Sequence, residues 1–176
     1  MVDRVAILAG NGTLPVLLHN ALPHSVCVVF RGASHHFKAD HSFIEARFER
    51  LGELFETLKS KGITKIVLAG SMHRPDLDPY EFDDLMRGIS TQLGEMLCQG
   101  DDALLRFVLK LFDQHGFCLV GAAQVVPDLV AESGMLTGPH EVQNEKDIYK
   151  ADQLLALMSS ADIGQAVVVE NGLVLG

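Results

Sequence analysis

The segment Arg4-Val-Ala-Ile-Leu-Ala-Gly10-Asn-Gly-Thr-Leu-Pro15 decides the fold class, because an apolar run breaks at two glycines and restarts as a helix. An unbroken apolar run with β-branched members, such as residues 5–9, is typical of a parallel strand buried on both faces. We expect Gly10 and Gly12 to adopt positive φ, which lets backbone N–H groups approach an anion. We also expect Thr13 to cap the helix that follows.

A helix that begins directly after such a turn presents unpaired N–H groups and the positive end of its dipole. Both features attract phosphate. The sequence therefore favours a phosphate or nucleotide site at Gly10, Asn11, Gly12 and Thr13. The alternative is a tight turn from strand to helix without a ligand, since glycine loops are only modestly specific.

Composition narrows the class of protein. The chain has 176 residues, of which 48% are hydrophobic, which suits one domain or one domain with part of another. Its formal net charge of -9 argues against general nucleic-acid binding, which depends on neutralising phosphates. Cys27, Cys98 and Cys118 lie in apolar contexts and are predicted to be small core residues in a reducing compartment. Since no segment resembles a signal peptide or a membrane span, we expect a cytoplasmic protein.

The rest of the chain alternates between apolar strands and amphipathic helices. Further strands are predicted at residues 26–30, 66–69 and 117–120, and helices are predicted to begin near residues 14, 51, 101 and 148. This alternation predicts an α/β fold with a Rossmann-like, mainly parallel sheet flanked by helices.

The end of the chain has a different pattern. Two apolar runs flank Asn171-Gly172, which predicts a β-hairpin with a type I′ turn. A bare apolar edge strand invites association, so we expect more chain to follow and this hairpin to lead into a second domain. The expected domains are a Rossmann-like N-terminal domain over residues 1–160, and a hairpin with the start of a truncated C-terminal domain over 161–176.

The loop that follows the strand at 66–69 is a second candidate site, because ligands of open α/β sheets gather at the carboxyl ends of strands. Ser71 and Arg74 are candidates for holding an anionic substrate, Arg74 by bidentate donation to phosphate. His73 is either a proton donor or a solvated loop residue.

Acidic residues form a third candidate site. Asp101 and Asp102 open a helix, where one of them is expected to act as a cap and the other to complement the helix dipole. The alternative is Mg²⁺ binding, because this ion is held by one or two carboxylates together with substrate phosphates. Gln165 is a further polar candidate, or it ends a helix. The histidines at positions 35, 36 and 41 lack the spacing of metal ligands and are expected to be solvated.

Four motifs, ILAGNGTLP, AGSMHRPDL, GDDALLRFVL and DIGQAVVVENGLVLG, occur in order along the chain. In these motifs the chain resembles the LpxI family of UDP-2,3-diacylglucosamine pyrophosphatases of lipid A biosynthesis in Gram-negative bacteria. The resemblance implies Mg²⁺-dependent hydrolysis of UDP-2,3-diacylglucosamine to 2,3-diacylglucosamine 1-phosphate and UMP. It also implies peripheral contact with the inner membrane, and it leaves homo-oligomer formation open.

The resemblance also assigns residues. It implies substrate or metal contacts at the glycine loop (Gly10, Asn11, Gly12), at Ser71, Arg74, Asp76 and Gln165, and at the acidic pair Asp101 and Asp102. Relatives often have asparagine where this chain has Ser71, and the family has a catalytic acidic residue in a C-terminal domain beyond position 176. We therefore expect the 176-residue chain to bind substrate and to be catalytically incomplete.

Two other classes compete with this interpretation. An NADP-binding oxidoreductase would use Arg31 for the 2′-phosphate, although Pro15 stands where a third glycine is expected. A non-catalytic lipid-phosphate-binding module would need an apolar groove. The apolar stripe of Met86, Leu93, Met96 and Leu97 either covers acyl chains or packs in the core.

Overall fold

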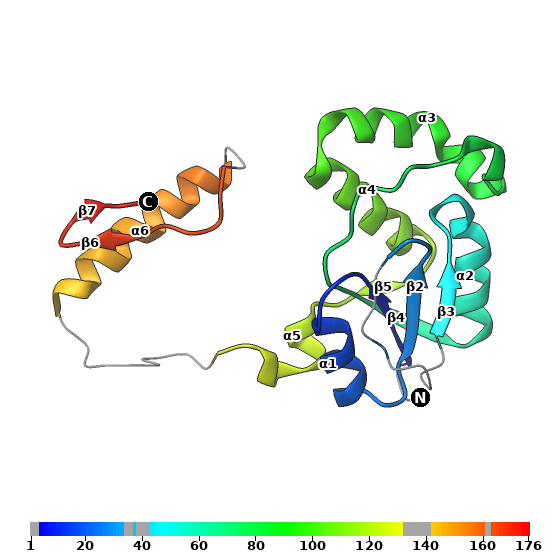
Figure 1. Cartoon of the computed structure of the whole chain (residues 1–176), viewed down its shortest axis with the longest axis horizontal. Coiled ribbons are helices and arrows are strands. Elements are labelled where there is room, and N and C mark those ends of the chain that lie inside the picture. Colours follow the sequence, from blue (N-terminus) through cyan, green and yellow to red (C-terminus); the bar gives the residue numbers. More distant parts are fainter. Residues whose placement is uncertain (1–3, 34–36, 38–42, 132–141, 161–162) are drawn as a thin grey trace. The chain divides into compact units, whose positions relative to one another are not determined.

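The computed structural model (Figure 1) describes residues 4–33, 37, 43–131, 142–160 and 163–176. The chain divides into two compact units, Met1–Val130 and Ala131–Gly176, which are described separately. The three histidines at positions 35, 36 and 41 lie outside the described residues.

The first unit is built on a parallel sheet of five strands in the order β3-β2-β1-β4-β5. This is the strand order of the Rossmann-like doubly wound fold, and it confirms the predicted fold class. The strand at β3 was not predicted. The strands are β1 (Arg4–Ala9), β2 (Val26–Phe30), β3 (Phe43–Ala46), β4 (Ile63–Ala69) and β5 (Cys118–Leu119).

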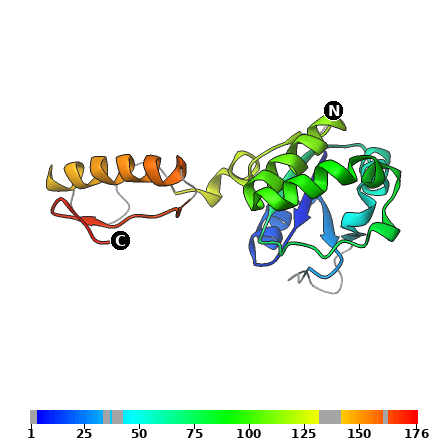
Figure 2. The same cartoon turned by 90° about the horizontal axis from the view of Figure 1, so that it is seen from above.

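Successive residues of a strand point to opposite faces of the sheet, so these apolar strands make both faces hydrophobic. Helices cover both faces. In β1, Ala6 and Leu8 join the core beneath α2, α3 and α4, whereas Ile7 and Ala9 join the core beneath α1 and α5. Figure 2 shows α3 and α4 side by side, on the same side of the strands. The helices are α1 (Leu14–Ala21), α2 (Leu51–Ser60), α3 (Asp84–Gln99), α4 (Asp101–Gln114) and α5 (Ala122–Val125).

Three phenylalanines form the centre of the larger core. Phe55 of α2 lies with its ring centroid 4.9 Å from that of Phe112 and 5.5 Å from that of Phe117, and all three side chains are buried. Edge and tilted aromatic contacts of this kind stabilise a core beyond the burial of area. They hold α2 and α4 together in the larger core on one face of the sheet.

The second unit consists of α6 (Val142–Ser160) and a hairpin of β6 (Val169–Glu170) and β7 (Leu173–Val174). Asn171 and Gly172 have φ values of 49° and 78°, which confirms the predicted turn with two positive φ angles. The Asp147 carboxylate accepts hydrogen bonds from both of their N–H groups at 2.7 Å, so α6 is tied to the hairpin. A domain boundary at residue 160 stays a prediction.

The cysteines differ from the prediction. Cys27 is buried in β2, and burial raises the pKa of its thiol to about 11. Cys98 and Cys118 are exposed, so the predicted core position is wrong for both. Cys98 stands near the end of α3 and Cys118 lies on an edge strand, where neighbouring elements do not cover them. Within the described residues, no helix is long and apolar enough to span a membrane.

Candidate functional site

The loops that follow β1 and β4 are joined to each other through their backbones. Asn11 N–H donates to the Ser71 carbonyl at 2.7 Å, and Ser71 N–H donates back to the Asn11 carbonyl at 3.1 Å. Strand order reverses between β1 and β4, and at such a point open α/β sheets usually hold ligands in a crevice. Here the antiparallel bridge fills the start of that crevice.

Two glycines make this bridge possible. A Cβ atom on Gly10 would overlap the Ser71 carbonyl oxygen, and one on Gly70 would overlap the Asn11 carbonyl oxygen. Gly70 also has a φ of 87°. The expectation of positive φ is confirmed for Gly12, at 100°, but is wrong for Gly10, which is needed for close approach instead. The sequence carries a signal for this pairing, since β1 and β4 both end in Leu-Ala and are both followed by glycine.

The start of α1 departs from the prediction in one respect. Thr13 precedes the helix with φ -90° and ψ -20° and makes no side-chain capping bond, so its predicted capping role is wrong. Its backbone is already helical, whereas a capping side chain needs an extended backbone. Within the described part of the chain, the N–H groups of Gly12 and Thr13 have no hydrogen-bond acceptor.

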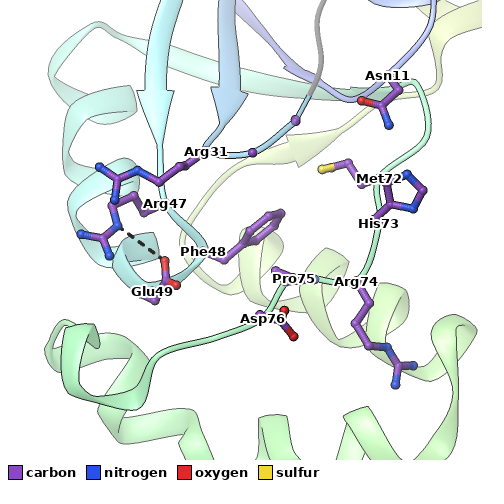
Figure 3. Close-up of a pocket in the computed structure, with 12 residues that line it drawn as sticks. Asn11, Arg31, Arg47, Phe48, Glu49, Met72, His73, Arg74, Pro75 and Asp76 are labelled. Atoms are coloured by element: carbon purple, nitrogen blue, oxygen red, sulfur yellow. Dashed lines mark ion pairs between the residues drawn. The ribbon is translucent and has the colours of Figure 1, made fainter.

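A hollow of about 270 Å³ opens beside the bridge, at the carboxyl ends of β2 and β3 (Figure 3). We call it the cationic hollow, because Arg31 and Arg47 line one side of it. In Figure 3 their guanidinium groups lie near each other and point away from residues 72–76. Phe30 and Ala46 are paired in register at the ends of β2 and β3, so Arg31 and Arg47, the residues that follow these strands, lie side by side. The hollow is lined by Asn11, residues 31–33, residues 47–49 and residues 72–76.

Both arginines have carboxylate neighbours. Arg31 Nε lies 3.7 Å from Glu45 Oε1 in an exposed pair, and Arg47 Nη1 lies 3.0 Å from Glu81 Oε2. Arg47 Nε is buried and makes no hydrogen bond with the described residues, although Glu49 Oε2 lies 3.6 Å away. A buried donor without a partner is costly, so a ligand oxygen would stabilise this guanidinium.

The segment 72–76 forms the other wall of the hollow. In Figure 3 the Phe48 ring points toward this wall, whereas the Arg74 guanidinium points away from the hollow. Arg74 Nη2 lies 2.5 Å from Asp101 Oδ1, and Arg74 Nη1 donates to the Leu97 carbonyl at 3.1 Å. The structure therefore brings together Arg74 and Asp101, which lie in separate motifs.

The acidic pair is held by two different arginines. Asp101 pairs with Arg74, and Asp102 Oδ2 lies 2.9 Å from Arg106 Nε one turn along α4. Neither aspartate caps the helix, because Gly100 occupies the capping position. Among the described residues, no three His, Cys, Asp or Glu side chains are grouped to hold a metal ion. Two exposed carboxylates fit Mg²⁺ only together with oxygens of a bound phosphate.

The remaining candidates are placed as follows. His73 and Asp76 line the cationic hollow, whereas Ser71 contributes its backbone to the bridge and is absent from the lining. Gln165 is exposed in the second unit, between α6 and β6, so it does not end a helix. The sequence analysis did not identify Arg47 or Phe48, because the strand that positions them was not predicted.

A second cavity, of about 410 Å³, lies against the same 72–75 segment. We call it the apolar pocket, since its walls are almost entirely hydrophobic. It shares Phe48 and residues 72–75 with the cationic hollow. Its other lining residues are Leu8, Phe30, Leu51, Leu68, Gly70, Asp101, Leu104, Leu105, Val108 and Phe112.

The strand order, with loops gathered at the carboxyl edge of a parallel sheet, defines the first unit as a Rossmann-like α/β domain. Residues 4–129 match the family described as the LpxI N-terminal domain, and the chain belongs to this family. It is 31% identical over 180 residues to the UDP-2,3-diacylglucosamine pyrophosphatase LpxI of Caulobacter vibrioides. The match covers 98% of this chain and 63% of the length of that relative. The resemblance inferred from the four motifs is thereby confirmed.

Proposed function

We propose that this chain forms the substrate-binding N-terminal part of a UDP-2,3-diacylglucosamine pyrophosphatase. The reaction would release UMP and 2,3-diacylglucosamine 1-phosphate, as a step of lipid A biosynthesis. One observation carries the proposal: a member of the LpxI family has two arginines side by side in a hollow at the carboxyl edge of its sheet. Arg31, directly after β2, would also suit the 2′-phosphate of the NADP alternative, but family membership favours the pyrophosphatase.

The substrate's diphosphate suits the cationic hollow. Guanidinium groups bind phosphate through paired hydrogen bonds, and Arg31 and Arg47 would offer such groups from adjacent strands. Arg47 Nε, buried and without an acceptor, would gain a phosphate oxygen as its partner. The free N–H groups of Gly12 and Thr13 at the start of α1 would add donors near Asn11, which lines the hollow.

Arg74 and Asp101 would respond to the bound diphosphate. Phosphate competes with carboxylate for a guanidinium, so a substrate phosphate near Arg74 would release Asp101 from its ion pair. Mg²⁺, when bound, would neutralise charge on the diphosphate, and Asp101 and Asp102 are the residues proposed to hold it. Ser71, Asp76 and Gln165 stay candidate contacts.

The substrate also suggests where the protein acts. Its acyl chains reside in a membrane and its nucleotide is made in the cytoplasm, so we expect a cytoplasmic protein with peripheral contact at the inner membrane. The acidic net charge of -9 agrees with the absence of nucleic acid among the expected partners.

Titration calorimetry of the 176-residue chain with UDP-2,3-diacylglucosamine tests the proposal. We expect Arg31→Gln and Arg47→Gln each to weaken binding about tenfold, the loss of a charge-assisted hydrogen bond. Arg87→Gln is the control, because Arg87 is an exposed arginine of α3 that pairs with Asp84 and does not line the hollow. No saturable binding, or equal affinity of all three variants and the unaltered chain, would contradict the proposal.

Release of UMP from the same substrate with Mg²⁺ tests the catalytic part. We expect the 176-residue chain to release little or no UMP, since the family resemblance implies a catalytic acidic residue beyond position 176. Turnover at the rate of a full-length relative would refute that expectation while leaving the binding proposal in place.

A further inference from the structure

The apolar pocket is open rather than filled by its own side chains. Leu105 of α4 lines it and is 48% exposed, whereas Leu111 and Phe112 on the same helix are buried. Apolar lining residues that stay in contact with solvent in a concave site are typical of a ligand-binding pocket. Three polar residues line it, His73, Arg74 and Asp101, and the two charged ones, Arg74 and Asp101, are paired with each other.

The pocket and the cationic hollow share a wall. Phe48 and residues 72–75 line both cavities, so a molecule with charged and apolar parts could place one part on each side of this wall. Arg74 belongs to this wall, and its guanidinium points away from the cationic hollow and pairs with Asp101.

We infer that the apolar pocket binds one acyl chain of the substrate while the cationic hollow binds its diphosphate. This inference rests on the proposed function and adds the place of the lipid. The occupant is an acyl chain because the pocket offers hydrophobic contacts beside an anion site, and no unpaired charge for a polar group. Burial of such a chain is favourable in proportion to the apolar area removed from water.

The apolar stripe in α3 is not a competing groove. Met86 and Leu93 are 2% and 7% exposed and belong to the larger core, and Leu97 packs against it. Of the two interpretations of this stripe, packing is therefore the one that the structure supports. The candidate lipid-binding residues therefore lie on α4 and in the segment 72–75, and not on α3.

The test compares substitutions of two leucines that have similar exposed fractions and lie on different helices. Leu105 lines the pocket, and Leu17 of α1 is 50% exposed and does not line it. Calorimetry measures binding of UDP-2,3-diacylglucosamine and of UDP-glucosamine, which has the same nucleotide and sugar without acyl chains. We expect Leu105→Gln to weaken binding of the acylated ligand about tenfold, or about 1.4 kcal/mol, and to leave UDP-glucosamine binding unchanged.

Two control variants should retain both affinities. Leu105→Met keeps an apolar side chain in the pocket, and Leu17→Gln makes the same polar change elsewhere. Unchanged binding of the acylated ligand by Leu105→Gln, or equal losses of affinity for both ligands, would overturn the inference that the pocket binds an acyl chain. Equal affinity of the unaltered chain for the two ligands would also overturn it and leave the proposed function standing. Binding of neither ligand by the unaltered chain would overturn the proposed function and, with it, this inference.

Discussion

Gly10 and Gly70 show how single residues shape the candidate site. Both stand directly after paired strands, and each lies where a side chain would collide with the opposite loop. The sequence analysis predicted the glycine loop but assigned Gly10 to a positive φ. It could not distinguish a glycine needed for its dihedral angle from one needed for close approach, since both appear as glycine after an apolar run.

Substitution of Gly70 tests this view of the bridge. Gly70→Ala adds a Cβ that overlaps the Asn11 carbonyl in a residue with φ of 87°, so we expect the free energy of unfolding to fall by about 2–3 kcal/mol. Gly88→Ala is the matched control. Gly88 lies within α3 with open space around it, and alanine there should raise stability by about 0.5–1 kcal/mol. Urea unfolding of both variants measures the difference, and equal stabilities would contradict the account.

At the scale of elements, an ion-pair network joins the segment after β3 to the start of α3. Glu81 closes the short helix η2 (Pro79–Glu81) and accepts hydrogen bonds from Arg47 and Arg50, the latter at the end of η1 (Phe48–Arg50). Asp83 caps α3 by accepting from Met86 N–H and also accepts from Glu53 N–H of α2. The network thereby holds Arg47, which lines the cationic hollow, in place.

We expect the ion pairs of Glu81 to contribute less to stability at acid pH, when this carboxylate becomes protonated. The Arg50 hydrogen bond and the charge of Arg47 lower the pKa of Glu81 below its ordinary value. A lowered pKa contributes stability that is present above the ordinary glutamate value of about 4.3 and is lost as pH falls through the lowered value. Glu81→Gln removes this titration. We therefore expect the stability difference between the unaltered chain and this variant to shrink as pH falls below about 4.3.

Denaturant unfolding at several pH values from neutral to acid measures that difference. Glu95→Gln is the control, since Glu95 is an exposed residue of α3 without an ion pair in the described residues. A gap between the unaltered chain and Glu81→Gln that stays constant throughout the pH range would contradict the role assigned to Glu81.

The elements that sequence analysis predicted are those with strong periodicity. The buried strands β1, β2 and β4 and the helices α1, α2 and α4 carry apolar runs or amphipathic spacing. The strand β3 has only four residues and includes Glu45, so its pattern is too short and too polar to stand out. Because β3 was not predicted, Arg47 was not predicted as a site residue either. Only the pairing of β2 with β3 brings Arg47 beside Arg31.

At the scale of the whole first unit, parallel topology assembles the site from segments that lie far apart in the sequence. Strand order places the ends of β2, β3 and β4 along one edge, and the bridge at Asn11 and Ser71 occupies the crevice between β1 and β4. The candidate anion site therefore lies on the β2 and β3 side of that crevice. Sequence analysis found the Arg74 loop and the acidic pair, but their ion pair depends on how α4 packs on the sheet.

The cationic hollow is the proposed binding place of the substrate's diphosphate. A titration of the ¹⁵N-labelled 176-residue chain with UDP, followed by ¹H–¹⁵N NMR, tests it most directly. We expect saturable shifts of the backbone amides at residues 11–13, 31–33, 47–49, 72–74 and 76, which line or adjoin the hollow; Pro75 has no N–H group. Saturable shifts confined to other parts of the chain, or none at concentrations where the acylated substrate binds, would contradict it.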